Sequence, residues 1–182
     1  MPKTFEQEQR FSYPWHETAN AVWNKYPNPH AEHVVSVDVL SQSIDPTSGS
    51  LRTERIIGVR QGAPGWLKRI VGASDDTYVR EVVMVNPLTK SFQMSSTNLS
   101  LSDYMLVKEY ITYLPSPIPE ETVFRQVAHI TCTNFFSGLL SSAGRKVEEW
   151  SYTRFNDNAA KGRDGLQSVL QSLYRSASTS PT

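Results

Sequence analysis

The sequence predicts an α+β fold in which one long helix covers a curved, strongly twisted antiparallel sheet of about seven strands. Residues 33–132 contain a series of short strand-like segments joined by turns rather than by helices, which is typical of an antiparallel meander. Residues 14–26 have the apolar spacing of a short amphipathic helix. Residues 134–174 contain no proline, and their apolar side chains recur at helical intervals.

The N-terminal part of the chain predicts a strand followed by a short helix. Residues 5–11 form a weak candidate strand because they are rich in Glu and Gln. Pro14 suits the first turn of a helix. The apolar face of that helix consists of Trp15, Ala19, Val22, Trp23 and Tyr26. The segment Pro27-Asn28-Pro29 ends the helix.

Six further segments have strand character. Residues 33–40 and 51–59 flank a turn at 45–50 and predict a hairpin. Four more strands are expected at residues 76–85, 90–101, 105–113 and 122–132. The polar residues of the middle strands indicate that the inner face of the sheet is not purely apolar; these are Ser95, Thr97, Asn98 and Gln126.

A short insert interrupts the strands at residues 61–72. It is too short to be stable as an isolated helix, and three glycines flank it. One interpretation is a short helix packed over the open end of the sheet. The other is a mobile lid whose apolar residues enter a lipid interface while its basic pair meets anionic lipid. The candidate lid and membrane-contact residues are Gly62, Pro64, Trp66, Leu67, Lys68, Arg69, Ile70 and Val71, of which the four apolar ones, from Trp66 to Val71, look exposed.

The long C-terminal segment carries charge on its predicted buried side. The apolar side is formed by Val147, Trp150, Ser151, Phe155, Gly162, Leu166, Val169 and Leu173. Arg154, Asn158 and Lys161 follow one another on that same side at spacings of i, i+4 and i+7. Because an unpaired buried charge is costly, an anionic group should lie opposite them. That group is either an acidic strand residue or the head group of a ligand, unless the charged side chains of Arg154 and Lys161 extend to water.

Two further residues are candidates for the same site. Lys25 lies at the border of the apolar face of the first helix, where it either caps the helix end or directs its ammonium into a cleft. His33 begins a strand shortly afterwards and is either a structural histidine or a site residue. The sequence leaves both alternatives open.

Composition excludes several classes of protein. Lysine plus arginine total 18 of 182 residues, as do aspartate plus glutamate, so no global field favours nucleic acid. The single cysteine, Cys132, excludes an internal disulfide, and we expect it to be a small buried hydrophobe. No stretch approaches the ~18 to 20 apolar residues of a membrane span, and the N-terminus lacks the features of a cleavable signal.

Motifs of enzymes and metal sites are not found. The chain has no Gly-x-Ser-x-Gly, His-Glu-x-x-His, Walker or dinucleotide-binding pattern, and its four histidines are far apart in sequence. These observations disfavour an enzyme and imply neither a metal nor a cofactor.

Several short segments, taken in their order and spacing, match a family pattern. They are Tyr26-Pro27-Asn28-Pro29, His33-Val34, Val37-Asp38-Val39-Leu40, Arg55-Ile56-Ile57, Pro64-Gly65-Trp66, Glu148-Glu149-Trp150-Ser151, Arg154-Phe155, Asn158 and Lys161-Gly162. Over residues 3–173 this pattern resembles the PRELI-domain proteins. The segments Thr53-Glu54-Arg55, Val59-Arg60-Gln61-Gly62 and Val79-Arg80-Glu81-Val82 are more similar to the slowmo-type, phosphatidylserine-handling branch than to the phosphatidic-acid branch.

The resemblance implies a lipid-transfer protein of the mitochondrial intermembrane space that works with a small helical partner carrying twin cysteine motifs. Its lipid-binding domain would span residues 1–175, followed by a disordered tail at 176–182. The implied fold encloses a lipid cavity between sheet, long helix and lid, with bound phospholipid as cargo. The head-group residues that carry over are Lys25, His33, Arg154, Asn158 and Lys161.

Two positions separate this chain from the phosphatidic-acid branch. That branch has basic residues where this sequence has Val59 and Gly62, and Arg60 is the nearest substitute. We therefore expect non-enzymatic transfer of phosphatidylserine, with Asn98 and Arg60 as further head-group candidates. The alternatives are transfer of phosphatidic acid, or a lipid-sensing module that binds one lipid without shuttling it.

Overall fold

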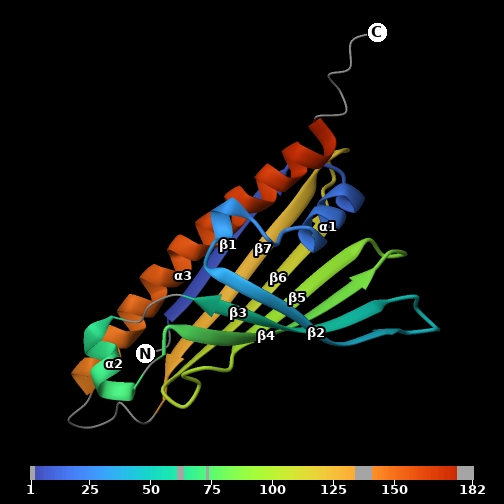
Figure 1. Cartoon of the computed structure of the whole chain (residues 1–182). Coiled ribbons are helices and arrows are strands. Elements are labelled where there is room, and N and C mark those ends of the chain that lie inside the picture. Colours follow the sequence, from blue (N-terminus) through green and yellow to red (C-terminus); the bar gives the residue numbers. More distant parts are fainter. Residues whose placement is uncertain (1–2, 61–63, 73, 134–140, 176–182) are drawn as a thin grey trace.

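The computed structural model describes residues 3–60, 64–72, 74–133 and 141–175. It contains one seven-stranded antiparallel sheet, a short N-terminal helix, a second short helix and a long C-terminal helix that crosses the sheet (Figure 1). The predicted α+β architecture is confirmed. The tail at 176–182, predicted to be disordered, lies outside the described residues.

The strands pair in the order β1-β7-β6-β5-β4-β3-β2, so the first strand lies beside the last one. Their bounds are Lys3–Phe11 (β1), Val34–Ile44 (β2), Leu51–Arg60 (β3), Asp76–Asn86 (β4), Ser91–Asn98 (β5), Met105–Pro115 (β6) and Thr122–Cys132 (β7). The weak prediction of a first strand is confirmed, because nine residues of β1 pair with β7. Pairing with a neighbouring strand here overrides the low strand propensity of the Glu and Gln residues.

Alternation along each strand determines which side chains face the long helix. In β5 the inward residues include Phe92, which is fully buried, and Met94. The expectation that Ser95 and Thr97 face inward is wrong, because they alternate with the inward positions. Asn98 lies at an inward position, on the same face of β5 as Phe92 and Met94.

The helices are α1 (Trp15–Trp23), α2 (Gly65–Val71) and α3 (Ser141–Leu170), with a 3-10 turn η1 (Pro29–Ala31) and a π-helical turn η4 (Gln171–Arg175). Gly72 follows the last residue of α2, and its φ of 65° lies in the left-handed region that glycine favours. Within the described ranges, no helix combines the length and the apolar character needed to cross a membrane.

The C-terminal end of the long helix differs in phase from the prediction. Leu170 is fully buried, whereas Leu173, predicted to lie on the buried side, is 43% exposed. The reason is that Leu166 and Leu170 continue the buried row at a spacing of four residues, whereas Leu173 follows the switch to π-helical geometry at residue 171.

Three apolar clusters hold α3 on the sheet, one at each end and a smaller one in the middle. The cluster at the C-terminal end joins α1 and residues 166–170 to the inner faces of β4–β7. The cluster at the N-terminal end joins Leu67 of α2 to Met105, Ile130 and Val147. The smaller cluster joins Ala159 and Phe155 in the middle of α3 to Phe5 of β1 and Ala128 of β7, and the polar site lies beside it.

Candidate functional site

Two adjoining cavities lie between the middle of α3 and the sheet. Their volumes are about 210 Å³ and about 170 Å³, and Val79, Phe155 and Asn158 line both of them. Most of the other lining side chains are apolar. Known ligand pockets span roughly 300–1,000 Å³, a range that the two cavities reach only together.

Three basic side chains lie near His33 at the wall of the larger cavity. Lys25 and His33 line this cavity, and Arg154 lines the smaller one. Burial lowers the pKa of His33 below its usual value, and the charges of Lys161, Lys25 and Arg154 lower it further. The four predicted side chains are therefore close enough to share one electrostatic environment.

Lys25 reaches the cavity by lying against the backbone of α3. It follows α1 in the chain, and a Cβ atom placed on Gly162 would lie 3.2 Å from its Nζ atom. Glycine at position 162 therefore leaves room for the ammonium group. The same stretch of chain is fixed to α3 by Asn28, whose buried side-chain amide donates a hydrogen bond to the carbonyl of Gly165 at 3.0 Å.

Arg154 and Lys161 occupy similar angular positions on α3 but different surroundings. Arg154 is half-buried, and its guanidinium carbon lies 5.6 Å from the ring centroid of Trp150. Lys161 is exposed and lines neither cavity. Its charge reaches His33, but its side chain is not part of the cavity wall.

Two other predicted head-group residues have structural partners. Arg60 is exposed, donates to Asp76 at 2.7 Å and lines neither cavity. Asn98 lines the smaller cavity, but its amide nitrogen donates to the carbonyls of Ser100 (2.9 Å) and Met105 (2.8 Å), and its oxygen accepts from the backbone N–H of Val107 (2.7 Å). Because both amide hydrogens are used in this way, Asn98 joins β5 to β6.

The predicted lid is the short helix α2, which begins after Pro64 and lies beside the first turns of α3 (Figure 1). The expectation that Leu67 is exposed is wrong: its side chain is only 2% exposed. A helix of seven residues gains little stability alone, so burial of Leu67 anchors it.

The remaining lid residues differ in their exposure. Trp66 is half-buried and packs at the edge of the same cluster, whereas Arg69 and Ile70 are exposed. Lys68 forms an ion pair with Asp75 at 2.6 Å. Gly62 and the side chain of Val71 lie outside the described residues.

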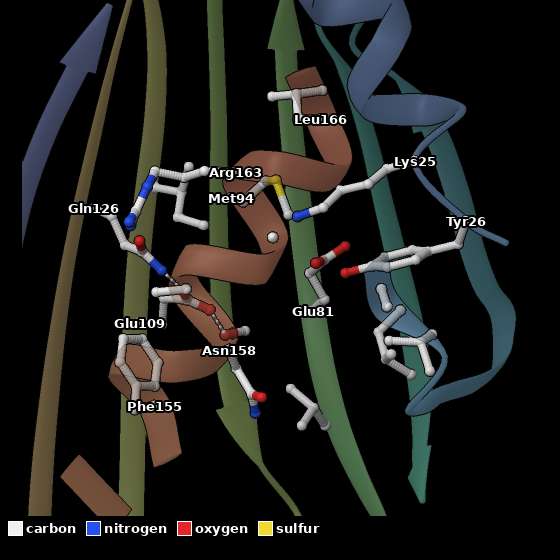
Figure 2. Close-up of a pocket in the computed structure, with 18 of the residues that line it drawn as sticks. Lys25, Tyr26, Glu81, Met94, Glu109, Gln126, Phe155, Asn158, Arg163 and Leu166 are labelled. Atoms are coloured by element: carbon white, nitrogen blue, oxygen red, sulfur yellow. Dashed lines mark hydrogen bonds between the residues drawn. The ribbon is translucent and has the colours of Figure 1, made fainter. Parts of the chain in front are cut away.

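Sequence reasoning missed the carboxylates and one cation of the larger cavity. Glu81, Glu109 and Arg163 line it together with Gln126, and Figure 2 shows their side chains around the cavity. Glu81 is buried and paired with Arg55, whose Nε donates at 2.7 Å. Burial raises the pKa of Glu81, against the opposing effect of the Arg55 charge.

The strand patterns contained a signal for these glutamates. Val79 and Val83 share one face of their strand, as do Val107 and Ile111, and each pair encloses one glutamate at the same alternating phase. A charged residue at an inward position between two valines, or between valine and isoleucine, indicates a polar patch inside the sheet.

Cys132 and the histidines form no metal site. Cys132 ends β7, is half-buried and donates a weak hydrogen bond from Sγ to the carbonyl of Gly144 at 3.4 Å. Burial raises the pKa of this thiol to about 11. Among the residues that the structure describes, no group of three His, Cys, Asp or Glu side chains is placed to bind a metal ion.

The arrangement of sheet, long helix and enclosed cavity is consistent with a START/Bet v1-like fold. Solved structures with this fold include the Zhui aromatase/cyclase from Streptomyces sp. R1128 (TM-score 0.63, 10% identity, covering 97% of this chain and 98% of that chain). The protein TTHA0849 from Thermus thermophilus also aligns (TM-score 0.52, 16% identity, 98% and 100% covered). At these identities the likeness concerns the fold alone.

Sequence comparison identifies the family. The PRELI-like family model matches residues 16–176, and the chain belongs to this family. Relatives include "Protein UPS2, mitochondrial" of Saccharomyces cerevisiae, 39% identical over 171 residues that cover 93% of this chain and 73% of the relative. "Protein UPS1, mitochondrial" of the same yeast is 34% identical, with 85% of each chain covered. "Protein slowmo homolog" of Dictyostelium discoideum is 31% identical, with 99% and 76% covered.

Proposed function

We propose that this protein carries phospholipids between mitochondrial membranes across the intermembrane space, without catalysing a reaction, and that phosphatidylserine is its main cargo. The relatives support a mitochondrial lipid-transfer family, and two of them are named mitochondrial. The observation that carries the proposal is the group of Lys25, Arg154 and Lys161 around His33, beside a largely apolar cavity.

The cations account for the phosphate end of the cargo. Lys25 and Arg154 supply charge-assisted hydrogen bonds to phosphate oxygens, and the amide of Asn158, which faces both cavities, adds a neutral donor. A bound anion would offset the three neighbouring positive charges that help to lower the pKa of His33.

The apolar walls account for the acyl chains. Transfer of a CH₂ group from water into an apolar site is favourable by roughly 0.8 kcal/mol, which offsets the loss of the bilayer. A diacyl phospholipid is larger than the drug-sized ligands that fill pockets of roughly 300–1,000 Å³, so the cavity must widen to admit the acyl chains. The exposed Arg69 and Ile70 on α2 are suited to contact with an anionic membrane surface.

The proposed partner protein and the alternative cargo are those that the resemblance to the PRELI-domain family implies. We propose that a small helical protein with twin cysteine motifs stabilises this chain. Phosphatidic acid is the alternative cargo. A lipid-sensing module is the alternative mode of action, and it would bind lipid but not move it between vesicles.

Native mass spectrometry of the purified complex, combined with vesicle-to-vesicle transfer, tests the proposal. We expect a bound phospholipid, transfer of phosphatidylserine faster than of phosphatidic acid, and loss of transfer in Arg154→Glu and Lys161→Glu with unchanged circular dichroism. Lys146→Glu is the matched control, since Lys146 is an exposed lysine of the same helix. Normal transfer by both test variants would rule out this head-group site, and a chemically altered lipid in the mass spectrum would indicate an enzyme.

A further inference from the structure

A row of four polar residues crosses the inner face of the sheet below α3. The strand register places Arg55 of β3 opposite Glu81 of β4, Glu81 opposite Ser96 of β5, and Ser96 opposite Glu109 of β6. Glu81, Ser96 and Glu109 all line the larger cavity. Acidic groups are therefore built into the floor of a cavity that also has cations on its wall.

The two glutamates differ in how their charge is balanced. Glu81 forms an ion pair with Arg55, and the Lys25 charge also acts on it. Glu109 accepts hydrogen bonds from two neutral donors, Ser96 Oγ at 2.8 Å and Gln126 Nε2. Among the described residues, no Lys, Arg or His lies within ion-pair distance of Glu109.

A chain of hydrogen bonds fixes Glu109 as an acceptor. Arg163 of α3 donates to the side-chain oxygen of Gln7, and the amide nitrogen of Gln7 donates to the oxygen of Gln126. The amide nitrogen of Gln126 then donates to Glu109. Every donor in this chain points toward the carboxylate, so Glu109 is oriented as an acceptor that faces the cavity (Figure 2).

A carboxylate with only neutral donors is suited to a cation supplied by the ligand. We propose that Glu109 binds the ammonium group of an amine-bearing phospholipid head group and thereby selects such lipids over phosphatidic acid. The inference rests on the proposed function and adds a specificity-determining residue to it. Lys25 and His33 on the wall of the same cavity bind the phosphate, so the charges of the cavity complement a head group that carries both signs.

The same glutamates disfavour a head group without an amine. The phosphate of phosphatidic acid has only negative charge to place near Glu81 and Glu109, and like charges in a partly desolvated site repel each other. Discrimination therefore arises both from a favourable ammonium–carboxylate contact and from repulsion of a cargo that lacks the ammonium.

Transfer assays with defined vesicles test this inference. Phosphatidylcholine vesicles contain phosphatidylserine, phosphatidic acid or N-acetylated phosphatidylserine, whose nitrogen carries no charge. For Glu109→Gln, which is nearly isosteric, we expect transfer of phosphatidylserine to fall at least tenfold while transfer of phosphatidic acid stays the same or increases. Glu6→Gln is the control, because Glu6 is an exposed glutamate on the outward phase of β1, and it should leave all rates unchanged.

The wild-type protein supplies a test that does not depend on the folding of any variant. It should transfer phosphatidylserine at least tenfold faster than the N-acetylated lipid. Equal rates for these two lipids, or equal losses of phosphatidylserine and phosphatidic acid transfer in Glu109→Gln, would overturn the role of Glu109 while leaving transfer itself intact. Failure of the wild-type protein to move any of the lipids would instead overturn the transfer function on which the inference rests.

Discussion

Replacing Gly162 with alanine tests whether the Lys25 ammonium must lie against helix α3. The new Cβ atom would lie 3.2 Å from Lys25 Nζ, a contact that the flexible lysine relieves by moving a few tenths of an ångström. The backbone of α3 gains stability at the same time, since alanine is favoured over glycine in a helix interior by about 0.8–1.0 kcal/mol. Stability and function should therefore change in opposite directions.

The magnitudes follow from these two effects. A gain near 1 kcal/mol corresponds to a rise in Tm of roughly 2–4 °C for a chain of this length. Complete loss of a hydrogen bond to a charged group costs roughly 1.5–3 kcal/mol, and a displaced Lys25 loses part of this. We expect binding of phosphatidylserine vesicles to weaken about threefold to tenfold, which corresponds to ~0.6–1.4 kcal/mol.

Gly165→Ala is the matched control on the same helix. The gain in helix propensity is the same, but the new Cβ atom would lie 3.1–3.3 Å from the buried, hydrogen-bonded amide of Asn28. This variant should be no more stable than the wild type, since the overlap is with a side chain that cannot move freely. Thermal denaturation and vesicle binding measure both effects, and a Gly162→Ala protein that is more stable yet binds normally would refute the placement of Lys25.

Four further predictions concern other parts of the structure. Leu67→Ala should lower the free energy of unfolding by about 2–5 kcal/mol in chemical denaturation, and a loss below ~1 kcal/mol would mean that α2 is not anchored. Asn98→Ala should destabilise the β5–β6 connection without changing which lipid is preferred, so a changed preference would contradict its structural role. The pKa of His33 in the folded protein lies below its value near 6.5 in the unfolded chain, so the unfolded chain binds more protons. The free energy of unfolding should therefore fall as the pH drops below about 6.5. His33→Gln should make the free energy of unfolding less dependent on pH in this range. With a thiol pKa of about 11, Cys132 should react with iodoacetamide at pH 8 far more slowly than a free cysteine, and rapid labelling would disprove its burial.

The fold was predictable because its signals are local. Alternation marks β3 to β7, and helical periodicity marks α1 and α3, so a single sequence was sufficient to predict the layers. The burial of Leu67 was not predictable, because the insert is short and its packing depends on Met105, Ile130 and Val147, three residues far away in the chain. Periodicity also gave the last turn of α3 the wrong phase, since a change to π-helical geometry leaves no mark in the apolar spacing.

The site was predictable only in part. Lys25, His33 and Asn158 line the larger cavity and Arg154 lines the smaller one, whereas their binding of a head group stays a prediction. Asn98 was predicted correctly as an inward residue, but only the structure shows that its side-chain amide donates hydrogen bonds to the backbone carbonyls of Ser100 and Met105. Glu109 was missed because inward positions were identified from apolar residues alone, and Glu109 is charged. Which charges meet across a sheet depends on strand register, and one chain read alone does not specify register.

The pairing of β1 with β7 has a consequence for how the molecule matures. The relay that orients Glu109 runs from Arg163 through Gln7 and Gln126, and its first hydrogen bond joins two residues that are 156 positions apart in the chain. The relay therefore forms only after both β1 and the middle of α3 have been synthesised and have come together. Such long-distance pairing slows folding, because loop closure is needed before the contacts form. The orientation of Glu109 should therefore be completed late in folding, after β1 has paired with β7 and α3 has packed on the sheet.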